Sequence, residues 1–236
     1  MTPLESFWLG LTLLATLVAV PLAVAQVDRS LALRVALVLP LWLALSAALS
    51  GFGVFSRGQT PLPLALAVLT PVALGTWAML RPGPLRNAAL AVPQPWLVSI
   101  HVVRLIGALF LVLAARELLP WSFALPAGWG DITVAVTAPF VAWWVIRKRP
   151  LNVPILWGWT LLGVSDFVLA VTLGALSSSG PQRLFFAGPP ADRVAELPLS
   201  LIPTFGVPLI ALLHVATIVQ LRAERHRVSS ELSAAE

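Results

Sequence analysis

Four ionisable side chains lie inside long apolar runs of this chain: His101, Arg104, Asp166 and His214. An ionisable group in the hydrocarbon core of a bilayer costs at least about 2.5 kcal/mol, and it normally faces a partner or a water-filled cavity. These residues are therefore the candidate functional set, as a ligand site or as an ion pair. One guanidinium, one carboxylate and two imidazoles could bind an anion or a proton, or ligate a haem.

The spacing of these residues predicts which of them can meet. At a rise of 1.5 Å per residue, Arg104 and Asp166 differ in depth by about 6 Å, which an extended guanidinium can bridge. Arg104 is expected to be the anion-binding or pairing group and Asp166 its counter-charge, so a structural ion pair between two helices remains an equal alternative to a ligand site. Asp166 also lies in a stripe of small residues at helical spacing, which predicts that it faces another helix: Gly163, Ala170 and Gly174.

His101 and His214 are predicted to lie at the same depth, and this supports an alternative hypothesis. Two neutral imidazoles on facing helices could be the axial ligands of a single haem b in a redox membrane subunit. A buried histidine also commonly hydrogen-bonds a neighbouring helix, so no cofactor is predicted and haem b stays the alternative. The chain has no Cys, which removes thiolate metal sites and disulfides, and no metal site is predicted.

A G-x-G-D sequence at Gly128, Gly130 and Asp131 resembles the motif around one catalytic carboxylate of intramembrane aspartyl proteases. The second carboxylate would have to be Asp166, which follows this motif, whereas in those proteases the other aspartate precedes it. We therefore expect no catalytic residue here. The glycines are interpreted as a structural turn, with Asp131 as the N-cap of the helix that follows.

The elements that carry these residues are predicted from hydropathy. The chain has 236 residues, of which 58% are hydrophobic and 11% charged, with a mean hydropathy of +0.92. Soluble domains carry roughly 25% charged residues, so the composition indicates an all-α, polytopic membrane helix bundle. Residues 222–236 are expected to form a cytoplasmic tail after a single domain, 1–221, of seven transmembrane helices: about 4–25, 31–55, 62–80, 95–115, 131–146, 153–176 and 199–221.

The distribution of basic residues predicts the orientation of this bundle. One side collects ten Lys and Arg residues and the other four, so the N-terminus is expected outside and the C-terminus inside. The first segment is expected to remain as a helix rather than to be cleaved after Ala25, because its start carries Glu5 and no basic residue. The only lysine, Lys148, falls between two segments, which excludes a retinal Schiff base in the bundle. The scattered basic residues give no support for nucleic-acid binding.

The stretch from His101 to Pro139 contains the buried Arg104, the Leu119–Pro120 break and the Pro-Ala-Gly-Trp-Gly-Asp sequence at 126–131. With the stretches 163–166 and 208–214, it resembles a broad group of uncharacterised bacterial multi-pass membrane proteins of about seven helices. The resemblance covers roughly the last 140 residues, from Pro95 to the tail. It implies a location in the bacterial inner membrane, and it brings no activity with it.

The function that these observations favour is non-enzymatic. We expect the polar bundle centre to bind, transport or sense a small solute or a proton. The alternatives are the single-haem redox subunit and a structural subunit of a membrane complex, for which the loop 177–198 offers the docking surface. The expected partners are the lipid bilayer and either further copies of the chain or another membrane subunit.

Overall fold

The computed structural model of the protein describes residues 1–56, 61–147 and 152–233. In these ranges all regular secondary structure is helical, and there is no strand. Seven of its helical stretches are long and apolar enough to cross a membrane. In chain order the elements are α1 (Pro3–Ala25), α2 (Arg29–Gly51), α3 (Leu62–Leu80), α4 (Pro84–Ala91), α5 (Gln94–Ser99), η1 (Ile100–Gly107), α6 (Ala108–Ala115), α7 (Trp121–Arg147), α8 (Asn152–Ser177), η2 (Ala191–Ala195), η3 (Ile202–Gly206) and α9 (Val207–Ser233).

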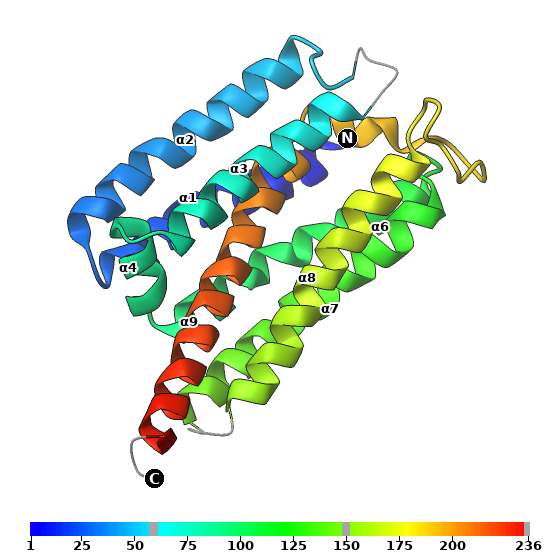
Figure 1. The fold of residues 1–236 in the computed structure, drawn as a ribbon. Helices are drawn as coiled ribbons and strands as arrows, with labels where there is room; N and C mark the ends of the chain where they lie inside the picture. Colours follow the sequence, from blue (N-terminus) through cyan, green and yellow to red (C-terminus); the bar gives the residue numbers. More distant parts are fainter. Residues whose placement is uncertain (57–60, 148–151, 234–236) are drawn as a thin grey trace.

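The helices form a bundle in which α9 is central. It packs against α3, α4, α5 and α8, while α7 packs against α8 and η1, and α1 packs against α2 and η1. Figure 1 shows the N-terminus at the same end of the bundle as the loop between α8 and η2, and the C-terminus at the opposite end. An odd number of long helices places the two termini at opposite ends, because consecutive long helices run in opposite directions.

Large apolar side chains cover the outside of the bundle as well as its centre. Leu4 is 75% exposed, Leu33 73% and Phe140 69%. A water-soluble helix would place polar residues at such positions, since an apolar stripe normally faces only the core. The outward faces are therefore compatible with a multi-pass membrane protein.

Most predicted segments coincide with helices, and the largest difference concerns the fifth. It was expected to begin at 131, whereas α7 begins at Trp121, directly after Pro120. Two other boundaries also differ: α2 ends at Gly51 instead of 55, where Gly53 turns the chain with φ of 72°, and α9 continues from the last apolar segment to Ser233. The residues expected to form a polar tail are rich in Ala, Glu and Arg, which favour helix.

The predicted turn at Gly128, Gly130 and Asp131 is wrong, because all three residues lie within α7. Glycine weakens an isolated helix by about 1 kcal/mol relative to alanine. Here, however, side chains of neighbouring helices lie where a Cβ at either glycine would be: Leu111 at Gly128 and Asp166 at Gly130. These glycines permit close helix packing and do not interrupt the helix.

Two helix starts have side-chain caps. Thr2 and Glu5 form a capping box at α1, and the Asp28 carboxylate accepts a hydrogen bond from the Leu31 N–H at the start of α2. This hydrogen bond lowers the pKa of Asp28 below its ordinary value. Glu5 also pairs with Arg116, at 2.5 Å between Oε1 and Nη1, which ties α1 to the segment that follows α6.

The backbone departs from the α-helix in two places near the bundle centre. The fourth long stretch, Gln94–Ala115, contains the eight-residue 3₁₀ segment η1 between α5 and α6. Before α9, η3 is a π-helical turn that contains Pro203, and Pro208 follows at the start of α9. Pro208 has no N–H to donate to the carbonyl of Thr204, and the Ser46 hydroxyl from α2 lies 3.5 Å from that oxygen as a long hydrogen bond.

The basic residues on which the predicted orientation depends are only partly described. Arg57, Lys148 and Arg149 lie outside the described residues. Arg29, Arg86 and Arg147 come at or next to helix ends on the side opposite the N-terminus, as the order of the helices requires.

Candidate functional site

Arg104 is the centre of a buried polar cluster contributed by η1, α7, α8 and α9. The residue is 2% exposed. Its Nε donates to Oδ1 of Asp131 at 2.7 Å, its Nη2 donates to Oδ2 of Asp166, and its Nη1 lies 3.2 Å from Nε2 of His214. One guanidinium therefore joins three other helical elements through its fork of donors.

The 3₁₀ geometry of η1 gives this cluster its alignment. At three residues per turn, side chains at i and i+3 eclipse one another. His101, Arg104 and Gly107 thus form one column, and all three are buried. A Cβ at 107 would overlap the Asp131 side chain, so the glycine allows α7 to approach.

Two further glycines make room for the cluster. A Cβ at 130 in α7 would overlap the Asp166 carboxylate, and a Cβ at 163 in α8 would overlap the His214 ring. The Cβ at 163 would also lie 3.2 Å from Nη1 of Arg104. Glycine at these positions is explained by the bulky polar groups of the neighbouring helices.

The rings of the two histidines pack against one another at a tilt, and His214 is the one that contacts Arg104. Their ring centroids are 4.1 Å apart at an interplanar angle of 35°, and the Trp159 ring packs at 5.1 Å from His101 and 5.5 Å from His214. Both rings are almost completely buried. Neither nitrogen of His101 has a hydrogen-bond partner in the part of the chain that is described, nor does Nδ1 of His214.

This stacking does not fit a haem between the two histidines. Bis-histidine ligation places the porphyrin plane between the two imidazoles. Carbon atoms are already in contact at about 3.5–4.0 Å, so rings with centroids 4.1 Å apart leave no layer for a porphyrin. In addition, Nε2 of His214 faces the Arg104 guanidinium. Among the described residues, no group of three or more His, Cys, Asp or Glu is placed to hold a metal ion.

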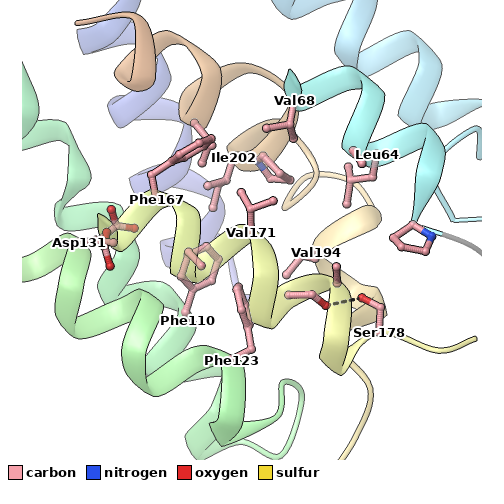
Figure 2. A pocket seen from close by; sticks show the side chains of 18 of the residues that line it. Leu64, Val68, Phe110, Phe123, Asp131, Phe167, Val171, Ser178, Val194 and Ile202 are labelled. Carbon is pink, nitrogen blue, oxygen red and sulfur yellow. Dashed lines mark hydrogen bonds between the residues drawn. The ribbon is translucent and has the colours of Figure 1, made fainter. Parts of the chain in front are cut away.

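A cavity of about 110 Å³ adjoins the charged cluster. Arg104, Asp131 and Asp166 line its polar end, and the rest of its wall is mainly apolar. Figure 2 shows Phe110, Phe123 and Phe167 around the cavity, with Asp131 at one end and Ser178 at the other. Leu64 and Val68 from α3 form the wall that faces α8.

The cluster is unequally exposed and unequally charged. The Asp131 side chain is 19% exposed, against 3% for Arg104 and 7% for Asp166. One guanidinium faces two carboxylates, so the fully ionised cluster has one negative charge in excess. This charge adjoins a cavity, where a ligand could neutralise it.

The structure brings together all four residues that the sequence selects. Arg104 and Asp166 form the expected ion pair, and His101 and His214 meet at the same level. Asp131 is the member that the sequence analysis missed, because it was assigned to a turn. Its signal was that it is the only charged residue in the run from Trp121 to Ile146. Trp159 was also missed, since tryptophans near helix ends are usual in membrane proteins.

No curated protein and no solved structure matches this chain. A family match begins at residue 61, just before α3, and ends at residue 222 in α9. It includes every residue of the Arg104 cluster and leaves out α1 and α2. Because the match covers well over half of the chain, the protein belongs to the family described as Domain of unknown function (DUF8737), whose match spans residues 61–222.

Proposed function

We propose that this protein is a multi-pass protein of the bacterial inner membrane that binds a small solute in the cavity beside the Arg104 cluster. In this proposal it transports or senses that solute and catalyses no reaction. The N-terminus lies outside and the C-terminus inside. The histidine pair packs against Arg104 through His214, and the bound solute contacts the carboxylates.

The membrane location is supported by the seven apolar helices and by their exposed leucine and phenylalanine side chains. The orientation is supported by basic residues, which are retained on the cytoplasmic side of a membrane. Arg29, Arg86 and Arg147 come near helix ends on the side of the C-terminus. The side of the N-terminus has fewer basic residues.

The observation that carries the proposal is that Asp131, whose side chain is partly exposed, lines the cavity. Burying an ion pair costs the solvation of both charges, and a pair that only joins helices needs no open volume beside it. Here Arg104 is sealed, while the carboxylate that it contacts lines an open volume beside three phenylalanines. Concave, mostly apolar volumes with a few convergent polar groups are typical ligand sites.

The proposal is tested by chemical access to the cavity. The chain has no Cys, so a single introduced thiol reports its own surroundings. Val171 lines the cavity, whereas Val134 is fully buried in a separate apolar cluster of α7, α8 and α9. Val171→Cys and Val134→Cys, purified in detergent, would each be treated with methyl methanethiosulfonate and followed by mass spectrometry.

If the cavity admits a small solute, Val171→Cys reacts at least about tenfold faster than Val134→Cys, because buried thiols need local unfolding to react. Equal rates would contradict a solute site. The Arg104 cluster would then be a structural lock between helices.

A further inference from the structure

The charge balance of the Arg104 cluster indicates what kind of solute the cavity takes. Arg104 makes one hydrogen bond to each of two carboxylates, through Oδ1 of Asp131 and Oδ2 of Asp166. The second oxygen of each carboxylate receives no side-chain hydrogen bond among the described residues. Both carboxylates line the cavity, so its polar end has two carboxylates against one guanidinium.

No other described group near the cluster supplies the missing positive charge. Arg104 from η1 contacts both carboxylates, His214 from α9 contacts Arg104, and His101 packs on the His214 ring. Nη1 of Arg104 can only donate, so Nε2 of His214 accepts in this contact and the ring is neutral. The α3 helix, which forms the facing wall, has no titratable side chain from Leu62 to Leu80. An anionic solute would therefore meet an excess of negative charge.

The apolar part of the wall selects the rest of the ligand. Three phenylalanines line the cavity, and aromatic rings attract organic cations through their negative faces. Ca²⁺ and Mg²⁺ take six or more oxygen ligands, which this mainly apolar wall does not provide. The volume of about 110 Å³ is somewhat smaller than the roughly 150 Å³ that holds a benzene molecule, so the apolar body is small.

We infer that the solute is a small amphipathic organic monocation, whose ammonium group binds Asp131 and Asp166 and whose apolar body lies among Phe110, Phe123 and Phe167. This inference rests on the proposed solute site and adds the charge and class of the ligand. The ammonium group would donate to the carboxylates where they line the cavity, and Asp131 is the more exposed of the two. Arg104 holds both carboxylates in position and does not itself contact the ligand.

The test uses three probes with one small body and different charge: isopropylamine, propan-2-ol and isobutyrate. At pH 7 the amine is a cation and the carboxylate an anion. Each probe is titrated against the reaction of Val171→Cys with methyl methanethiosulfonate, and the concentration that halves the rate is recorded. We expect isopropylamine to protect at a concentration about tenfold or more below that of propan-2-ol, and the carboxylate to protect least.

Substitutions at the polar end assign this preference to the carboxylates. In the Val171→Cys chain, Asp131→Asn removes the excess charge and keeps an acceptor for Arg104, so the preference for the amine over the alcohol should fall to about threefold or less. Asp192→Asn, in η2, is the matched control and should keep the full preference. Should Asp131→Asn fail to fold, Asp166→Asn replaces it with the same expectation.

The outcomes separate this inference from the proposed function. Equal or better protection by the alcohol or the carboxylate would overturn the cation inference and leave a solute site in place. No protection by any probe, with Val171→Cys still reactive, would also overturn it. Slow modification of Val171→Cys without any probe would refute the solute site itself.

Discussion

Gly130 offers the sharpest test of how the buried cluster is held. A methyl group at this position in α7 would overlap Oδ1 of Asp166, whose carboxylate is held in place by Arg104. The Gly130→Ala variant must therefore move the carboxylate away from its partner. Breaking a buried ion pair costs about 3–5 kcal/mol, and the better helix propensity of alanine returns up to about 1 kcal/mol. We expect a net loss of about 2–4 kcal/mol of unfolding free energy.

The assay is equilibrium unfolding of the detergent-purified protein, followed by tryptophan fluorescence. Gly158→Ala in α8 is the matched control, since no atom lies within 4 Å of a Cβ at that position. It should be as stable as the parent chain, or up to about 1 kcal/mol more stable. In an Asp166→Ala background the carboxylate is gone, so adding Gly130→Ala should cost nothing further. If Gly130→Ala were as stable as Gly158→Ala, the close packing of α7 on Asp166 would be refuted.

Four further predictions concern other parts of the chain. Gln220→Ala should cost about 2 kcal/mol in the same unfolding assay, because the Gln220 amide donates to the Ala89 and Val92 carbonyls at 2.8 and 2.7 Å, whereas the exposed Gln26→Ala should change little. A membrane-impermeant maleimide should label Asn87→Cys only in inverted vesicles and Ala187→Cys only in right-side-out vesicles. Labelling of both in the same vesicles would contradict the proposed orientation. Haem titrated into the purified protein should give no Soret band that depends on His101. A band that is lost in His101→Ala would show that the two histidine rings separate to bind haem. The Asp28 cap stabilises the chain above its ordinary pKa near 3.8 and is lost as the pH falls through the lowered folded-state pKa, so the stability difference between Asp28→Ala and the parent should shrink in acid.

The depth of each residue along its helix was the part of the site that sequence could predict. Counting residues from the helix ends placed Arg104 within reach of Asp166, and His101 level with His214. The structure contains both contacts. This reasoning needs only long, straight apolar helices, and it does not depend on knowing which helices are neighbours.

Asp131 could not be placed in the same way, because local sequence signals favoured a different structure. Pro126, Gly128 and Gly130 are typical of a turn, and an aspartate after them is typical of an N-cap. In the folded chain these glycines are required by tertiary packing, because Leu111 lies where a Cβ at Gly128 would be and Asp166 where a Cβ at Gly130 would be. A glycine needed for close approach and a glycine needed for a turn look the same in one sequence.

The 3₁₀ segment explains why one arginine can contact partners on three elements. In an α-helix successive residues turn by about 100°, so His101 and Gly107 would point about 120° apart. At three residues per turn they align with Arg104 in one column. Gly107 then lies beside Asp131, and His101 lies beside His214 on the other side of the guanidinium. In an α-helix this alignment would be lost, so Gly107 could not lie beside Asp131 while His101 lay beside His214.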